Sequence, residues 1–239
     1  MLPLSSVATL REGFEEPVLW RRNREPFITV RADVVDGVQG PFASQKILPS
    51  LAKIELPPGY RLELGGAIEE SNKSNVALFK VFPGMFAVIL LLLMWQLRSF
   101  KRLLLVFTTA PLGVIGAVPA LLVFGAPFGF VALLGLIALG GMIQRNALIL
   151  VDQIDQDLEG GAPLARAIVE ATVRRARPVL LTAAAAVLAM IPLTRSVFWG
   201  PMAITIMGGL IVATVLTLVV VPALYALLMR EQKPEALAT

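Results

Sequence analysis

The fold of this chain is decided by residues 128–151, which read FGFVALLGLIALGGMIQRNALILV. The stretch carries one charged residue, Arg145, and is long enough to cross a hydrocarbon core of about 30 Å, because a spanning helix needs about 20 residues. A helix this apolar on every side belongs in lipid rather than on a water-soluble surface. The stretch therefore predicts a membrane-spanning helix.

Four further apolar stretches surround it, and composition agrees with them. Of the 239 residues, 56% are hydrophobic and 16% are charged, against about a quarter charged in an ordinary soluble domain. We therefore expect an all-α membrane bundle of about five transmembrane helices, preceded by a small α+β portion at residues 1–75. The transmembrane domain is expected over residues 76–230. Its predicted spans are residues 76–97, 103–124, 128–151, 178–194 and 201–229.

The N-terminal portion has the composition of soluble protein. Residues 18–24 and 27–34 alternate between apolar and polar side chains, which predicts two strands joined by a turn. Residues 42–53 place their apolar side chains near one face of a helix, and residues 60–64 alternate again as a strand. The expected order is strand, strand, helix, strand.

Basic residues alternate between the loops of the predicted spans. They gather in residues 98–102, in residues 152–177 and after residue 229, whereas residues 125–127 carry no charge. Since cationic loops stay in the cytoplasm, we expect residues 152–177 to be a cytoplasmic amphipathic linker and residues 231–239 a cytoplasmic tail. Within the linker, residues 162–176 predict a short amphipathic helix on the membrane surface. The portion at residues 1–75 would then lie outside the cytoplasm.

Nothing in the chain carries a folded N-terminal portion across a membrane. We therefore expect that at least one helix precedes residue 1. The alternative is that Met1 starts a truncated gene product that does not insert properly.

Arg145, between Gln144 and Asn146, is the most informative residue of the third span. A guanidinium inside a membrane costs several kcal/mol or more unless it is paired or hydrated. One interpretation is a buried cation that faces carboxylates of a partner helix in an ion or proton pathway. The other is an arginine that extends to the surface and pairs with Asp152. No acidic residue lies inside a predicted span, so a buried partner would come from outside this chain.

Thr182 is an isolated hydroxyl inside the fourth span. It is interpreted either as a hydrogen-bonding member of a relay or as a side chain that bonds a carbonyl one turn earlier in its own helix.

Several classes of function are disfavoured by the residues. The chain has no cysteine and no histidine, so disulfides, thiolate chemistry and the commonest general base are absent. No nucleophile–base set, metal cluster or phosphate loop is present, and no basic stripe with interleaved aromatics. We expect no enzyme activity, no cofactor, no metal site and no nucleic-acid partner.

Four sequence runs together resemble the resistance-nodulation-division efflux transporters, most closely the hydrophobe/amphiphile exporter branch. The segment PPGYRLELGG at residues 57–66 is similar to the end of their second periplasmic loop. The resemblance covers essentially the whole chain in order. The runs are PLGVIGA at 111–117, GGMIQRNALILVD at 140–152, RPVLLT at 177–182, and FWGPM through MGG between 198 and 209.

The resemblance implies an architecture and partners. Family members have twelve spans in two halves, so this chain would hold the last five, with residues 1–75 forming part of a periplasmic porter subdomain of split βαβ fold. Members are homotrimers of the bacterial inner membrane that exchange protons for amphiphilic compounds, including drugs. They work with a periplasmic adaptor protein and an outer-membrane channel. A non-transporting membrane protein, or an inert remnant of a truncated transporter gene, is the alternative function.

The resemblance also implies a proton relay. The family couples acidic residues of its fourth span to a cation that matches Arg145 and to a threonine that matches Thr182. A further arginine of the family matches Arg175, and Asn146 lies beside the cation. The family cation is more often a lysine, and an arginine hardly releases its proton. We hypothesise that Arg145 is a fixed counter-charge whose pairing changes as carboxylates outside this chain titrate.

Overall fold

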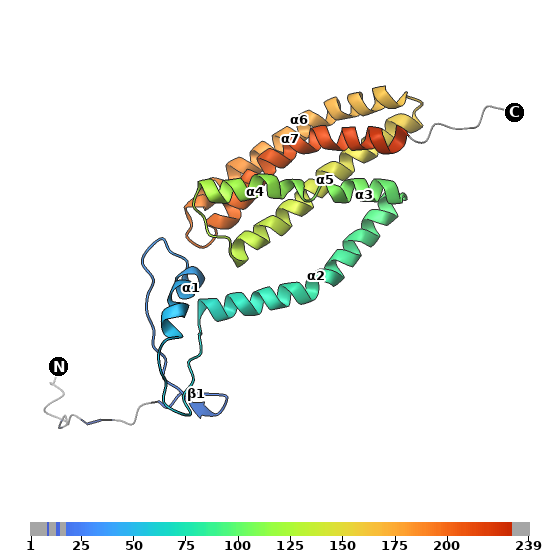
Figure 1. Ribbon diagram of the computed structural model, residues 1–239. Helices are drawn as coiled ribbons and strands as arrows, with labels where there is room; N and C mark the ends of the chain where they lie inside the picture. Colours follow the sequence, from blue (N-terminus) through green and yellow to red (C-terminus); the bar gives the residue numbers. More distant parts are fainter. Residues whose placement is uncertain (1–8, 10–12, 15–17, 231–239) are drawn as a thin grey trace. The chain divides into compact units, whose positions relative to one another are not determined.

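The structure is a computed structural model that describes residues 9, 13–14 and 18–230 (Figure 1). The chain divides into two compact units, Met1–Val35 and Asp36–Thr239. In the first unit, β1 (Arg21–Arg22) pairs antiparallel with β2 (Glu25–Pro26). A hairpin is therefore present, but not where it was predicted. Its turn lies at Asn23 and Arg24, its second strand occupies the expected break at Glu25–Pro26, and residues 27–34 form no strand. Such a hairpin is marginal by itself, because no further strand among the described residues pairs with it and its own residues are exposed.

The second unit is almost entirely helical. Five of its segments are long and apolar enough to cross a membrane, with α3 and α4 together forming one of them. The predicted class, a helical membrane bundle with a small α+β portion, is confirmed. Its elements are α1 (Gly40–Leu51), α2 (Ala67–Leu97), α3 (Phe100–Thr108), α4 (Leu112–Val123), α5 (Phe130–Glu159), α6 (Leu164–Met190), a 3-10 turn η2 (Pro192–Arg195) and α7 (Gly200–Arg230).

Three local expectations differ from these elements. Residues 60–64 form no strand, and most of their side chains are exposed, because alternation alone cannot supply the neighbouring strand that a ladder needs. Helix α2 begins at Ala67, so the predicted span at 76–97 is the apolar part of a longer helix that starts with a polar segment. Helix α6 runs without a break through Pro178, so the helix expected at residues 162–176 is continuous with the fourth span. The predicted tail at residues 231–239 lies outside the described residues.

The break between α3 and α4 is a local repair around Pro111. The Thr108 hydroxyl donates to the Leu104 carbonyl at 2.8 Å, and the Thr109 hydroxyl donates to the Val106 carbonyl at 2.6 Å. These bonds satisfy carbonyls near the point where the helical ladder is interrupted, which makes an interrupted helix tolerable in lipid. Thr109 is fully buried.

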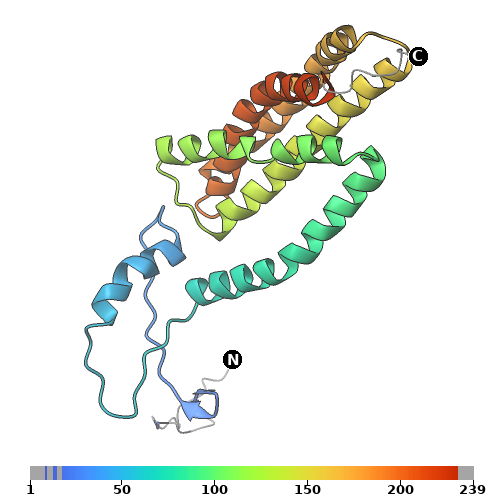
Figure 2. The same ribbon diagram turned by 45° about the vertical axis from the view of Figure 1, so that its right-hand side comes forward.

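Helix α7 is the centre of the bundle and packs against α4, α5 and α6, as both views of the ribbon show (Figures 1 and 2). Its crossing with α4 depends on glycine. A Cβ atom placed on Gly116 would collide with the Gly208 carbonyl oxygen, and one on Gly208 would collide with the Ala120 Cβ. Small residues let two backbones approach closely, which is how membrane helices gain contact without a hydrophobic driving force.

The helical unit also ties α1 to the loop before α7. The Gln39 side-chain amide donates to the carbonyls of Val197, at 2.8 Å, and Phe198, at 3.2 Å. This contact joins segments that are 158 and 159 residues apart in the chain. It holds the start of α1 against the end of the bundle that carries the loop at residues 196–199.

Candidate functional site

Arg145 lies on a face of α5 that no described element covers. The buried residues of α5 form a stripe that includes Leu139, Ile143 and Ala147. Arg145 is two residues from Ile143 and from Ala147, which places it on the opposite side of a helix with 3.6 residues per turn. Its side chain is exposed.

Small residues continue this face. Ala138, Gly141 and Asp152 are exposed as well. Together with Arg145 they follow one another at intervals of three, four and seven residues, which places them along one side of the helix. A Cβ atom added to Gly141 would meet nothing within 4 Å. We call this set, with Arg145, the open face of α5. It has room for another helix to approach closely.

Arg145 makes no hydrogen bond or ion pair with any residue in the described part of the chain. In particular it does not pair with Asp152, whose carboxylate accepts a hydrogen bond from the Gln156 side chain at 2.9 Å. The interpretation in which Arg145 pairs with Asp152 therefore finds no support in the geometry. The guanidinium is left available to a group outside residues 18–230.

Arg175 is one of the side chains that link α5 and α6. Its Nη2 donates to the Gln153 Oε1 at 2.9 Å, and the two helices run in opposite directions. Arg145 lies eight residues before Gln153, and Thr182 lies seven residues after Arg175. At about 1.5 Å per residue, Arg145 and Thr182 lie at about the same height in the bundle.

The structure does not join the predicted relay residues by direct bonds. The Thr182 hydroxyl donates to the Val179 carbonyl at 3.0 Å, the bond within its own helix that was one of its two interpretations. The Thr182 side chain is exposed, and that of Asn146 is half-buried. Arg145 and Thr182 thus share a height on open surface, while Arg175 lies at the more basic end of the bundle.

Sequence reasoning missed a polar cluster at that basic end. Arg102 on α3, Asp155 on α5 and Tyr225 on α7 meet there, although they lie far apart in the chain. Arg102 and Asp155 were assigned to loops, and Tyr225 was counted only as part of a span. No pattern along the sequence could have paired them, since the pairing depends on how three helices are aligned.

The arrangement can hold a fixed positive charge in an apolar span and present it to a neighbouring helix. It offers no cage for a metal ion, because the described residues contain no group of three or more acidic, histidine or cysteine side chains. Its chemistry is therefore electrostatic: a cation on an uncovered face attracts carboxylates and stabilises their ionised form.

Comparisons with known proteins show the family to which the chain belongs. A family model described as the AcrB/AcrD/AcrF family matches residues 1–229. The nickel-cobalt-cadmium resistance protein NccA of Alcaligenes xylosoxydans xylosoxydans is 34% identical over 97% of this chain and 22% of its own length. The cobalt-zinc-cadmium resistance protein CzcA of Cupriavidus metallidurans is 32% identical over 97% of this chain and 22% of its own length.

Drug-resistance proteins and a solved structure match as well. The multidrug resistance protein MdtC of Erwinia amylovora is 28% identical over 94% of this chain and 22% of its own length. A crystal structure of a heavy metal efflux pump superposes with a TM-score of 0.65 at 29% identity, covering 78% of this chain and 19% of that one. The chain spans about a fifth of the length of the curated relatives that it matches.

Proposed function

Since this chain belongs to the AcrB/AcrD/AcrF family of resistance-nodulation-division transporters, we propose that it forms the C-terminal part of a proton-driven exporter of the bacterial inner membrane. The single observation that carries the proposal is the open face of α5. An unpaired guanidinium on an apolar span, with room for a helix beside it, is expected where a partner helix supplies carboxylates.

In this mechanism Arg145 is a fixed positive charge rather than a proton carrier. An arginine keeps its proton at physiological pH, so the groups that bind and release protons are carboxylates of the partner helix. When such a carboxylate is ionised, its attraction to Arg145 draws the partner helix toward α5. When it is protonated, the attraction disappears and the helices are free to move, which couples proton binding to a change of conformation.

Thr182 and Arg175 have supporting roles in the proposal. Thr182 lies at the height of Arg145, so its hydroxyl is placed to bond a carboxylate or a water molecule that enters beside α6. Arg175 holds α6 against Gln153 of α5 and so keeps that height constant. Asn146 neighbours Arg145 and offers an amide to the same partner helix.

Two substrate classes are proposed. The motifs favour amphiphilic compounds, and the name of the relative MdtC agrees with drug export. The names of NccA and CzcA favour divalent metal cations such as nickel, cobalt and cadmium, and these relatives have the higher identities, 34% and 32%. We therefore place metal cations first and amphiphiles second. The assembly would be a homotrimer with a periplasmic adaptor protein and an outer-membrane channel.

Deleting the gene that encodes this chain tests the proposal and both substrate classes. We expect the deleted strain to tolerate less nickel, cobalt or cadmium, and reintroduction of the gene to restore tolerance. Growth across a concentration series of each metal and of amphiphilic dyes is the measurement. A loss of tolerance to dyes alone would favour the amphiphile class. Unchanged tolerance to both classes would favour an inert remnant of a transporter gene.

A further inference from the structure

The polar cluster at the basic end of the bundle joins three helices through one oxygen atom. Arg102 Nη2 on α3 lies 3.0 Å from Asp155 Oδ1 on α5, and the Tyr225 hydroxyl on α7 donates a short hydrogen bond to the same oxygen. Asp155 is 9% exposed and Tyr225 is fully buried. We call this set the Asp155 clasp.

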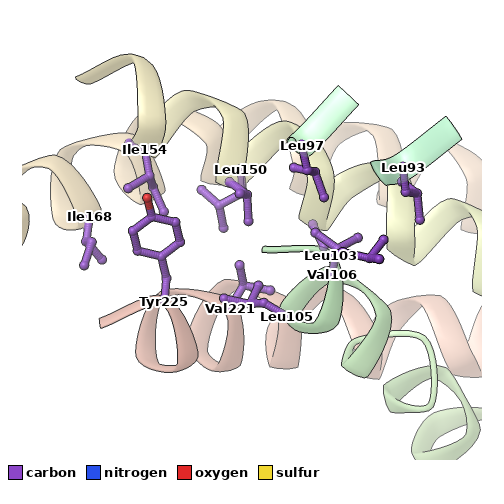
Figure 3. Close-up of a cluster of buried hydrophobic side chains, with 13 residues drawn as sticks. Leu93, Leu97, Leu103, Leu105, Val106, Leu150, Ile154, Ile168, Val221 and Tyr225 are labelled. Carbon is purple, nitrogen blue, oxygen red and sulfur yellow. The ribbon is translucent and has the colours of Figure 1, made fainter. Parts of the chain in front are cut away.

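Apolar side chains surround the clasp. Leu103, Leu150 and Val221 belong to the same buried group as Tyr225, and α2, α3, α5, α6 and α7 all contribute to it. Figure 3 shows Tyr225 beside Ile154, with its hydroxyl next to that side chain. Asp155 and Tyr225 are therefore largely shielded from water, whereas the Arg102 side chain is 31% exposed, so salt screens the ion pair in part.

A partly buried ion pair such as this one adds little net stability to the fold. The free energy that desolvation of the two charges costs is about as large as the free energy that their attraction contributes. Removal of one partner, however, leaves the other charge without its counter-charge in apolar surroundings. The Nε atom of Arg102 is itself buried and has no hydrogen-bond partner among the described residues. The clasp thus tolerates an unsatisfied donor while it keeps α3, α5 and α7 in one alignment.

The clasp lies on the same helix as Arg145. Helix α5 is continuous from Phe130 to Glu159, and Arg145 is ten residues before Asp155. Toward its other end, α5 packs closely on α7, since a Cβ atom added to Gly135 would lie 3.0 Å from the Met202 carbonyl oxygen. Helix α5 is therefore held on α7 at two heights, with Arg145 between them.

We infer that Asp155 is a positioning residue for Arg145. By accepting bonds from Arg102 and Tyr225, it fixes the rotation and the height of α5, and so it fixes where the guanidinium of Arg145 stands on the open face. Arg145 has no bond of its own in the described structure that could hold it there. The inference rests on the proposed function, because it assigns a role within the same proton-driven cycle.

Spin labels measure this positioning directly. The chain has no cysteine, so cysteines introduced by Gly141→Cys on α5 and Val219→Cys on α7 would be its only labelling sites. Both positions are exposed. In the labelled chain, reconstituted in liposomes, we expect one narrow distribution of distances between the labels. Asp155→Asn is expected to shift or broaden that distribution by about 2 Å or more, because α5 then loses its alignment with α7.

Two further variants make the experiment decisive. Tyr225→Phe keeps the ring and the packing but removes the hydroxyl, so it tests the clasp even if Asp155→Asn fails to fold. Thr214→Val is the matched control. Among the described residues, the Thr214 hydroxyl, also buried on α7, bonds the Leu210 carbonyl of its own helix, at 2.6 Å, and no other helix. Unchanged distances in both Asp155→Asn and Tyr225→Phe would overturn the inference.

A transport measurement completes the test. In the complemented deletion strain, we expect Asp155→Asn to lower the maximal export rate about ten-fold without changing the KM for substrate, and Thr214→Val to leave both unchanged. A shifted label distribution together with an unchanged export rate would also overturn the inference. The label distances do not depend on transport, so failure of the inference leaves the proposed function standing, and failure of the proposed function leaves the distances intact.

Discussion

Replacing Arg145 by alanine is expected to lower export by about a hundred-fold or more. Removal of one partner from a buried charge pair typically costs about 3–5 kcal/mol, and each 1.4 kcal/mol is a factor of ten. Without the guanidinium, the proposed carboxylates of the partner helix have no counter-charge, so they stay protonated and stop cycling. Export from cells that carry the variant gene in the deleted background is the measurement.

Two further variants show whether a loss of export comes from the lost positive charge or from a smaller amount of protein in the membrane. Arg145→Lys keeps a positive charge, so we expect it to retain a measurable part of the export rate. Lys101→Ala removes an exposed cation of α3 outside the proposed relay, and we expect it to leave export unchanged. The amount of each protein in the membrane is measured by immunoblot. Export at the wild-type rate by Arg145→Ala would reject the role assigned to Arg145.

Gly208→Leu is expected to destabilise the bundle by about 3 kcal/mol or more. Overpacking a tight contact costs about 1–3 kcal/mol when side chains can adjust, and more when backbone must move. At this site a Cβ atom would meet Ala120 Cβ and would lie 3.0 Å from the Gly116 carbonyl oxygen, so α4 and α7 would have to separate. We expect the variant to show a lower unfolding midpoint and less folded protein in detergent.

Gly141→Leu is the matched control for Gly208→Leu. Both glycines lie inside long helices, but a Cβ atom on Gly141 meets nothing within 4 Å. We expect Gly141→Leu to unfold at the wild-type temperature and nevertheless to impair export, because a bulky side chain on the open face keeps a partner helix from Arg145. Equal unfolding temperatures for Gly208→Leu and the wild-type chain would contradict the packing account.

The long apolar runs predicted the membrane helices well, because length and composition alone determine whether a helix can cross a bilayer. Two interpretations of Arg145 were left open by the sequence, pairing with Asp152 or with a carboxylate outside the chain. The structure shows no bond between Arg145 and Asp152, and the role of Arg145 stays a prediction. Residues 60–64 failed as a strand because a strand depends on neighbours that its own sequence does not describe.

The clasp and the glycine crossing needed the structure. Asp155 and Tyr225 are 70 residues apart in the chain. Their contact depends on how two parallel helices are aligned, and the hydrophobic pattern of the sequence does not determine that alignment. The contact of Gly208 with Gly116 on α4 could not be predicted from spacing along the chain, because it depends on where two helices cross. The roles of Arg145, Thr182, Arg175 and Asn146 remain predictions.

The most direct test of the account is proton movement in liposomes that contain the purified protein and a pH-sensitive dye. With an imposed proton gradient, the account predicts that added substrate speeds the collapse of the gradient through the wild-type protein, and that Arg145→Ala abolishes this acceleration. Substrate-dependent proton flow at the wild-type rate through Arg145→Ala would show that the open face of α5 does not carry the coupling.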